Sequence, residues 1–255
     1  MITILDSFAF CFVSNAPLRK EAGDESEIVS QLVFGEPVEI LNIDGNWSQI
    51  KSEADGYIGF VDPKQLLPLT QVELIKWKGE YTYLNRLFGN LTQHNGIHLV
   101  PRGSFIGAEE VFKIGKNKYH LETDTRLKES VWETALEYLN TPYLWGGKTP
   151  SGIDCSGFTQ VIMRLYGIEL PRDSSIQVSM GKSVTFNEKK TGDLAFFQNT
   201  QGSITHVGII GPNNQVIHAS GFVRIDDLTS DGIWNKNYNK KTHQIFSIQR
   251  FIKVN

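Results

Sequence analysis

The sequence predicts an α+β protein in which small all-β barrels precede a domain that runs from helices to a sheet. Short apolar stretches separated by turn residues fill the first seventy positions, with the spacing of roughly 8–12 residues that small β-barrels show. The pattern changes near Thr123, where apolar residues take up helical spacing, and again from Gly192, where strands follow. We therefore expect three parts: residues 1–70, 71–122 and 123–255.

Turns that contain glycine separate the expected strands of the two barrel modules. In residues 1–70 they lie at Gly35-Glu36-Pro37, Asp44-Gly45-Asn46 and Asp55-Gly56. Residues 70–89 could form either a helix or a strand pair, and a later turn at Gly115 joins two further strands. We expect residues 71–122 to form a second, less regular barrel module.

Helices open the third part and strands close it. Val131 and Ala135 recur near helical spacing before Pro142 ends the segment. A loop rich in glycine and proline leads to a second expected helix over residues 155–166, which Gly167 closes. The expected strands are DLAFF, HVGII, QVIHAS and FSIQRFI.

The composition fits a globular protein and argues against two classes of binding protein. The chain has 25 basic and 28 acidic residues among 255, a net charge of −3, whereas dedicated nucleic-acid binders carry a basic surface. The same balance argues against tight capture by anionic polymers or membranes. No run of about 18 apolar residues is present, so no membrane-spanning segment is expected. We expect neither nucleic acid nor a membrane as a partner.

The start of the chain does not have the form of a secretory signal. Residues 2–13 are largely apolar, but Asp6 interrupts them and no basic segment precedes them. If Met1 is the natural start, we expect a cytoplasmic protein. Removal of a signal peptide ahead of it would instead imply export.

The chain has two cysteines, Cys11 and Cys155. Cys11 stands in the apolar stretch AFCFV, where a buried core thiol is expected. A disulfide between the two is not expected in a cytosolic protein. Two cysteines also cannot build a cysteine-rich zinc site.

The surroundings of Cys155 favour a nucleophile. Asp154 is a natural N-cap, so Cys155 opens the expected helix, where the helix dipole would lower the pKa of its thiol. His206 and His218 lie near the ends of two neighbouring expected strands. If these strands form a hairpin, one histidine can accept the thiol proton while the other fixes its orientation.

Each of these signals has an alternative explanation. A lone cysteine at a helix start is more often structural, and a histidine between apolar strand residues is often part of the core. Cys155, His206 and His218 could also hold zinc, although no glutamate has the H-E-x-x-H spacing of a hydrolytic site. We assign structural roles to the remaining histidines, which are His94, His98, His120 and His243.

Five ordered segments in the third part resemble the NlpC/P60 cysteine peptidases. They are YLWGG with GIDCSGF (residues 143–147 and 152–158), LPRDSS (170–175), GDL (192–194), THVGI (205–209) and IHAS (217–220). Residues 10–70 resemble bacterial SH3 (SH3b) modules, on Ser26-Glu27, VSQ at 29–31 and GYIGFV at 56–61. The resemblance is thin over residues 71–120, and Phe60 stands where many SH3b modules have tryptophan.

The resemblance implies a papain-like α+β catalytic domain and a set of catalytic residues. Cys155 would be the nucleophile, His206 the general base and His218 the residue that orients it. The backbone N–H of Cys155 would help to form an oxyanion hole. Tyr143 matches the family tyrosine near that hole, although it could equally be a packing aromatic beside Trp145. No metal and no organic cofactor are expected.

The order of SH3b modules and peptidase domain resembles the γ-D-glutamyl-L-diamino acid endopeptidases of murein peptide recycling. That resemblance implies substrates with a free N-terminal L-Ala, whose ammonium needs anionic or acceptor partners. Residues at the matching positions are Asp154, Ser156, Asp173 and Ser174 in the catalytic domain and Glu27 and Tyr57 in the SH3b module. Ser156 could instead be only a first-turn helix residue. Glu27 could be a solvated loop residue and Tyr57 a barrel-surface aromatic.

We therefore expect a monomeric cysteine peptidase whose partner is a murein peptide, L-Ala-γ-D-Glu-diamino acid, with meso-diaminopimelate or L-Lys as the diamino acid. It would cleave the bond between the γ-D-glutamyl group and the diamino acid. The alternatives are a peptidoglycan-binding SH3b protein with a silent catalytic domain, a hydrolase of intact peptidoglycan stems, and a thiol acyltransferase or amidase on the same fold.

Overall fold

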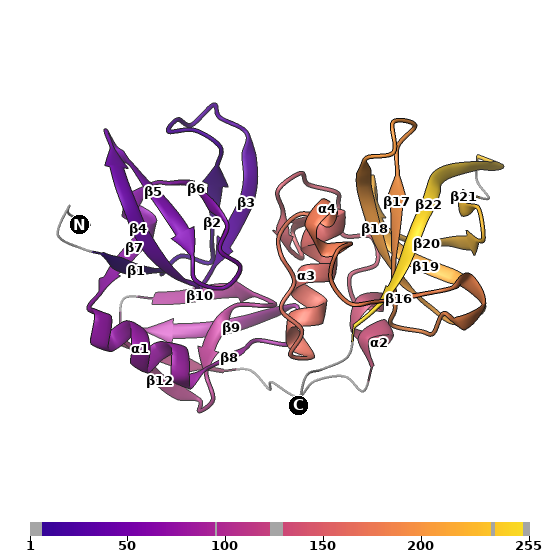
Figure 1. The fold of residues 1–255 in the computed structure, drawn as a ribbon. Coiled ribbons are helices and arrows are strands. Elements are labelled where there is room, and N and C mark those ends of the chain that lie inside the picture. Colours follow the sequence, from indigo (N-terminus) through magenta and orange to yellow (C-terminus); the bar gives the residue numbers. More distant parts are fainter. Residues whose placement is uncertain (1–6, 95, 123–129, 236–237, 252–255) are drawn as a thin grey trace. The chain divides into compact units, whose positions relative to one another are not determined.

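The computed structural model describes residues 7–94, 96–122, 130–235 and 238–251, and it contains two compact units (Figure 1). The first unit holds the described residues up to Glu122 together with Trp145–Pro150, and the second holds the remainder. Thr123, where we placed the last boundary, lies outside the described residues, so the three-part division stays a prediction. Helices and strands occur in both units, which confirms the α+β class.

A seven-stranded antiparallel sheet of order β3-β2-β6-β5-β4-β1-β7 begins the first unit. The predicted turns connect its strands, and at one of them Gly35 has a φ of +76°. A Cβ at this glycine would lie 2.1 Å from the carbonyl oxygen of Phe105, so no larger residue fits. The elements are β1 (Phe8–Cys11), β2 (Asn15–Arg19), β3 (Ile28–Val33), β4 (Pro37–Asp44), β5 (Trp47–Ser52), β6 (Ile58–Val61), the 3-10 helix η1 (Pro63–Gln65) and β7 (Leu66–Leu69).

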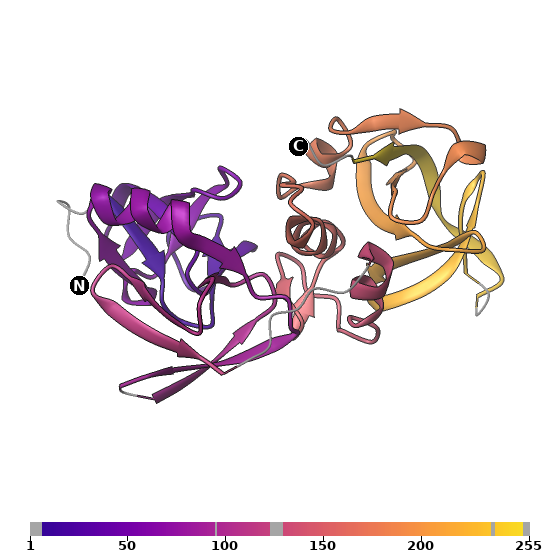
Figure 2. The ribbon, with the colours of Figure 1, turned by 90° about the horizontal axis from the view of Figure 1, so that it is seen from below.

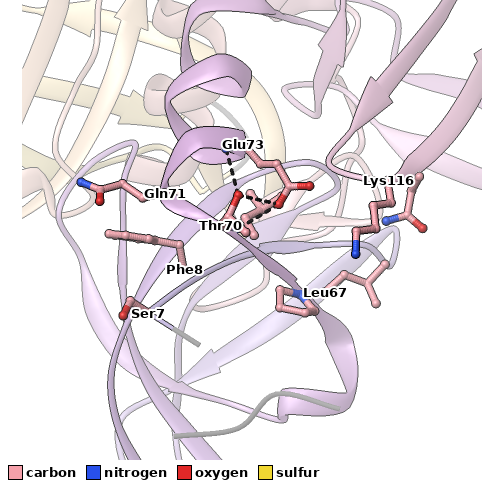
Figure 3. A pocket seen from close by; sticks show the side chains of 10 residues that line it. Ser7, Phe8, Leu67, Thr70, Gln71, Glu73 and Lys116 are labelled. Atoms are coloured by element: carbon pink, nitrogen blue, oxygen red, sulfur yellow. Dashed lines mark hydrogen bonds between the residues drawn. The ribbon is translucent and has the colours of Figure 1, made fainter. Parts of the chain in front are cut away.

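Residues 70–89, for which the sequence left a helix or a strand pair open, form a helix followed by strands. Helix α1 (Gln71–Glu80) begins at a capping box, in which the Thr70 N–H donates to Glu73 Oε2 at 2.8 Å and the Glu73 N–H donates to Thr70 Oγ1 at 3.2 Å (Figure 3). A pocket of about 590 Å³ lies beside this helix start, with Lys116 on its rim (Figure 3).

The remaining strands of the first unit share a core with the first sheet. β11 pairs with β8, and the order of the four-stranded sheet is β10-β9-β13-β12. Phe10 and Phe34 of the first sheet region belong to one apolar cluster with Trp77 of α1 and Tyr119 of β13, and α1 lies against β1 and β7 (Figure 2). The strands are β8 (Tyr81–Tyr83), β9 (Phe88–Gln93), β10 (Gly96–Pro101), β11 (Phe105–Gly107), β12 (Val111–Ile114) and β13 (Asn117–Leu121).

A nearly closed sheet forms most of the second unit (Figure 1). Its order is β16-β22-β17-β18-β19-β20-β21, and β21 also pairs with β22, so six of its strands form a ring. The ring leaves those strands without a free edge. The sequence did not predict β16, β20 or β21. The elements are β16 (Lys182–Val184), the 3-10 helix η2 (Phe186–Glu188), β17 (Leu194–Gln198), β18 (Ile204–Ile210), β19 (Gln215–Ser220), β20 (Phe222–Thr229), β21 (Gly232–Asn235) and β22 (Lys240–Arg250).

Helix α3 (Cys155–Leu165) positions the candidate nucleophile against this sheet. The Asp154 carboxylate caps the helix start by accepting the N–H of Gly157 at 2.7 Å. At the other end Gly167 has a φ of +76°, as predicted for the residue after the helix. The helix is almost wholly buried and contacts β18 and β19. The other short elements are α2 (Val131–Leu136), β14 (Lys148–Thr149), β15 (Gly152–Ile153) and α4 (Ser174–Gln177).

Among the described residues, no helix combines the length and the apolar character that a membrane crossing requires.

Candidate active site

Cys155 lies where helix α3 meets strand β18. Its side chain is 6% exposed, and its thiol has a backbone hydrogen bond with Val207, the residue after His206. The sulfur therefore lies beside the strand segment that carries the predicted base. Both cysteines of the chain are free thiols, and Cys11 is fully buried in the core of the first unit.

A chain of hydrogen bonds runs from His206 through His218 to Asp226. Nε2 of His206 lies 2.8 Å from Nδ1 of His218, and Nε2 of His218 lies 3.1 Å from Oδ2 of Asp226. The predicted hairpin carries both histidines, because β18 and β19 pair antiparallel through Ile209 and Ile217. The structure thus brings the two predicted histidines together and adds a carboxylate that sequence reasoning missed.

These hydrogen bonds determine which nitrogen of each imidazole carries the proton. An ionised carboxylate only accepts hydrogen bonds, so Nε2 of His218 must carry a proton. In a neutral ring Nδ1 of His218 then accepts, so the proton of a neutral His206 lies on Nε2. The remaining nitrogen of His206, Nδ1, is left with a lone pair and can accept a proton from a thiol.

Asp226 is held in its ionised form by its neighbours. Arg224 Nη2 donates to its Oδ1 at 2.9 Å, and Asn235 Nδ2 lies 3.4 Å from its Oδ2. Burial acts to raise the pKa of Asp226, but the hydrogen bonds from His218 and Arg224 outweigh it, and the pKa lies below its ordinary value. No local sequence pattern indicated Asp226, because β20 itself was not predicted.

The pKa of Cys155 contradicts the prediction from its helix position. Burial, followed by the Asp154 carboxylate, raises the pKa of this thiol to about 12, although hydrogen bonds with the backbone of Val207 and the charge of Arg172 oppose the rise. Desolvation of the sulfur outweighs the helix N-terminus. Burial also lowers the pKa of His206 well below its ordinary value, with further lowering by His218 and His243. The resting pair is therefore a neutral thiol and a neutral imidazole.

A buried arginine neutralises Asp154. Arg172 Nη1 donates to Asp154 Oδ1 at 3.0 Å and to Ser156 Oγ at 2.9 Å, and Arg172 Nη2 donates to Asp154 Oδ2. All three side chains are buried. Gln177 of α4 donates to the carbonyl of Ser156 at 3.1 Å and so ties α4 to the start of α3. Sequence reasoning assigned no role to Arg172 or Gln177, although both lie within or next to the LPRDSS segment.

Asp173 and Ser174 begin α4 directly after Arg172 in the sequence. Asp173 is the N-cap residue of α4, and its charge acts on Arg172. Ser174 is buried. The structure thus brings Asp154, Ser156 and Asp173 together around Arg172, while Ser174 is the first residue of α4.

Tyr143 forms an isolated parallel bridge with Ile153, two residues before Cys155. Its phenol is half-buried. Burial, followed by the nearby Cys155 and Asp154, raises its pKa, so it is a neutral hydrogen-bond donor at pH 7. Its hydroxyl therefore lies within electrostatic reach of the candidate nucleophile.

Glu27 and Tyr57 lie in the first unit. Glu27 accepts a hydrogen bond from Trp145 Nε1 at 2.8 Å and lies 3.5 Å from Lys20 Nζ. Tyr57 is half-buried and contacts the core of the first sheet. Trp145 itself is 58% exposed. Glu27 therefore contacts the YLWGG segment through Trp145, and its role in binding substrate stays a prediction.

His243 does not have the isolated structural position that we assigned to it. Its ring stacks on that of His206, with centroids 4.2 Å apart and an angle of 24° between planes, and it lies 5.6 Å from the His218 ring. Burial lowers the pKa of His243 to about 4. Its place on β22, 25 residues after His218 and two strands beyond β20, gave no local signal of this contact.

Comparison with known families matches two stretches of the chain. Residues 140–243 match the NlpC/P60 family, and residues 18–66 match the bacterial dipeptidyl-peptidase SH3 domain. The chain therefore carries an NlpC/P60 domain with a bacterial SH3 domain ahead of it, which confirms the resemblance seen in the sequence.

Named relatives show how far the similarity extends. The chain is 43% identical over 101 residues to a probable endopeptidase NlpC of Escherichia coli, covering 38% of this chain and 66% of that protein. It is 26% identical over 223 residues to the gamma-D-glutamyl-L-lysine dipeptidyl-peptidase of Bacillus subtilis, covering 76% of this chain and 73% of that protein. The first of these matches spans just under two thirds of its relative.

A solved structure shows the same fold. The crystal structure of an NlpC/P60 family protein from Bacillus cereus aligns with a TM-score of 0.80 at 21% identity, over 96% of this chain and 99% of that chain. This likeness confirms the expected α+β fold of the NlpC/P60 type.

Proposed function

We propose that this NlpC/P60 protein is a cysteine peptidase that cleaves murein peptides between γ-D-glutamate and the diamino acid, when their N-terminal L-Ala is free. One observation carries the proposal. Hydrogen bonds link Asp226 to His218 and His218 to His206, and His206 lies in the strand segment beside Cys155 at the start of α3. The similarity to the Bacillus subtilis enzyme over most of the chain supports the substrate class.

In the first step, Nδ1 of His206 accepts the Cys155 proton while Sγ attacks the γ-carbonyl carbon of the substrate. Because the pKa of Cys155 is raised to about 12, the proton leaves in step with the attack rather than before it. The backbone N–H of Cys155 donates to the developing oxyanion. His206 then gives the proton to the amine of the diamino acid, which departs and leaves a thioester.

In the second step, His206 removes a proton from water, whose oxygen attacks the thioester carbonyl. The C–S bond breaks and the thiol is restored, with L-Ala-γ-D-Glu as the acid product. Asp226 and His218 keep Nε2 of His206 protonated through both steps, so that Nδ1 remains the working nitrogen.

The charges around α4 support recognition of an ammonium group. Asp154 and Asp173 carry two negative charges, and Arg172 offsets one of them. This excess of negative charge would attract the substrate ammonium, and we assign the attraction to Asp154 and Asp173 together, with Asp173 as the residue that the variant below tests. Ser156 and Ser174 supply hydroxyl oxygens nearby.

A recycling role implies a cytoplasmic monomer that acts on short soluble peptides, and we propose this setting together with the activity. It requires neither nucleic acid nor a membrane as partner.

The decisive experiment compares L-Ala-γ-D-Glu-diaminopimelate with the same peptide acetylated on its N-terminus, by mass spectrometry of the digest. We expect release of L-Ala-γ-D-Glu from the free peptide only, and no turnover by Cys155→Ala. Equal cleavage of both peptides would remove the ammonium site and indicate intact wall stems as substrate. Tight binding without cleavage would indicate a binding protein.

Asp173→Asn tests the ammonium assignment. This variant should lose discrimination between the free and acetylated peptides, with KM rising for the free form. Ser175→Ala on the exposed side of α4 is the matched control. Unchanged discrimination in Asp173→Asn would contradict the assignment to Asp173.

A further inference from the structure

We propose that His206, His218 and His243 form a binding site for a divalent transition metal such as Zn²⁺, and that the bound metal inhibits the peptidase. The inhibitory part rests on the proposed function, whereas the binding part does not. The site differs from the zinc alternative considered from the sequence, because it uses His243 in place of Cys155 and serves as an inhibitory site.

The three imidazoles converge closely enough to share an ion. One ring nitrogen from each lies within 4.8 Å of the others. A tetrahedral Zn²⁺ with bonds of about 2.0–2.1 Å holds its nitrogen ligands about 3.4 Å apart. The His206–His218 pair, at 2.8 Å, must open slightly, and His243 must move closer.

His243 is the ligand that can make this adjustment. It is only partly buried on β22, and its Nδ1 contacts the adjacent Thr242 Oγ1 at 2.9 Å. A change in its side-chain torsions would turn the ring out of the stack on His206 and direct a nitrogen towards the other two. His206 and His218 are buried and held by the sheet, so they supply the preformed part of the site.

Asp226 gives the site the outer support that histidine metal ligands usually have. It accepts the Nε2 proton of His218 at 3.1 Å, which leaves Nδ1 of that ring free to bind a metal. A carboxylate in this position orients the ring and raises its basicity as a ligand. The three histidines would fill three of the four coordination positions of a tetrahedral ion, and water would take the fourth.

Metal binding would reverse the proton arrangement of His206. Nε2 must give up its proton to bind the ion, and a neutral ring then carries its proton on Nδ1. The proton passes from one nitrogen to the other through solvent, and no oxidation or reduction occurs. Nδ1 can then no longer accept the Cys155 proton, so thioester formation stops without any bond between metal and sulfur.

The binding test uses the full-length Cys155→Ala protein, which lacks the thiol. Calorimetry with Zn²⁺ should show one ion per chain, and the Co²⁺-loaded protein should give visible absorption bands of a nitrogen- and oxygen-ligated tetrahedral ion. Cys155→Ala/His243→Phe keeps a ring against His206 but removes the third ligand, and we expect its affinity to fall at least tenfold. Absence of binding to Cys155→Ala, or equal affinity in both proteins, would overturn the site.

The inhibition test uses the protein with Cys155 intact and the free L-Ala peptide as substrate. Each variant is compared with its own metal-free rate. The Zn²⁺ concentration for half-inhibition should rise at least tenfold in His243→Phe, and a chelator should restore activity. If His243→Phe has the same Zn²⁺ concentration for half-inhibition as the unchanged protein, the inhibition comes from metal bound to Cys155 and the proposal is wrong. If no murein peptide is cleaved at all, the proposed function fails while the binding titration still decides the metal site.

Discussion

The ion pair between Lys148 and Glu36 yields a quantitative prediction about the first unit. Lys148 Nζ lies 3.3 Å from Glu36 Oε2, and the two side chains are 1% and 0% exposed. Removing one partner of a buried pair leaves an uncompensated charge and costs about 3–5 kcal/mol in typical cases. We expect this loss in the unfolding transition of the first unit, which contains both residues.

The two partners should not be equivalent. Glu36 also accepts a bond from Ser52 Oγ at 2.8 Å and from the Val33 N–H at 3.1 Å, so it keeps two donors when Lys148 is lost. Among the described residues, the carboxylate that pairs with the Lys148 ammonium is that of Glu36. Glu36→Gln should therefore cost about 3–5 kcal/mol, and Lys148→Met about 1–3 kcal/mol.

Urea unfolding of the full chain, followed by tryptophan fluorescence and circular dichroism, measures both values. Lys76→Met removes the exposed pair with Glu80 and is the matched control, with an expected loss below about 0.5 kcal/mol. The double variant Glu36→Gln/Lys148→Met should be more stable than the sum of the single losses predicts. If Lys148→Met proves as costly as Glu36→Gln, or if both lie within error of the control, the reasoning is refuted.

Three further predictions concern the second unit. Asp226→Asn presents an amide N–H to His218 and disfavours the working tautomer, so kcat should fall by about 10²–10⁴ with little change in KM; a fall below fivefold would contradict the relay. Arg172→Met leaves Asp154 buried without its counter-charge and should cost about 3–5 kcal/mol in urea unfolding, whereas an unchanged midpoint would show that the helix cap alone stabilises that carboxylate. The pKa of His206 lies well below its ordinary value, so this base stays unprotonated as the pH falls. The acid limb of the kcat/KM profile should therefore lie below pH 6.5, the usual histidine pKa. An acid limb at or above pH 6.5 would contradict a resting pair of neutral thiol and neutral imidazole.

The pH dependence of stability has the same physical origin. His206 and His243 have lower pKa values folded than unfolded, so the unfolded chain binds more protons once the pH falls below the unfolded value. Their contribution to stability is complete above about pH 6.5. It decreases as the pH falls, and for His243 the loss continues to about pH 4.

Local sequence patterns, together with the family resemblance, pointed to Cys155, His206 and His218, whose catalytic roles stay predictions. Asp154 caps a helix that begins at Cys155, and a short hairpin brings His206 beside His218, so these positions depend on contacts within a few residues or across one turn. Asp226 and His243 come from β20 and β22, and only the closing of the sheet brings them to the histidines. Strand alternation cannot indicate such a contact, because it fixes a face of the sheet and not its neighbour.

The predicted thiol pKa was wrong for a related reason. The helix dipole is a local property that can be seen in sequence, whereas the desolvation of Cys155 depends on the whole strand region that covers it. Arg172 shows the same limit. Its segment was recognised, but its pairing with Asp154 depends on how α4 lies against α3.

The loop from Trp145 to Pro150 shows that the two recognised domains are not independent along the chain. Its sequence belongs to the NlpC/P60 match, yet its contacts belong to the first unit. Lys148 donates its N–H to Gln31 Oε1 at 2.8 Å, and a Cβ on Gly146 would lie 2.4 Å from the carbonyl oxygen of Ile28. Removing the SH3 region would leave the Lys148 ammonium without its carboxylate. We therefore expect such a truncation to destabilise the segment between Trp145 and Pro150, which precedes Cys155 in the sequence.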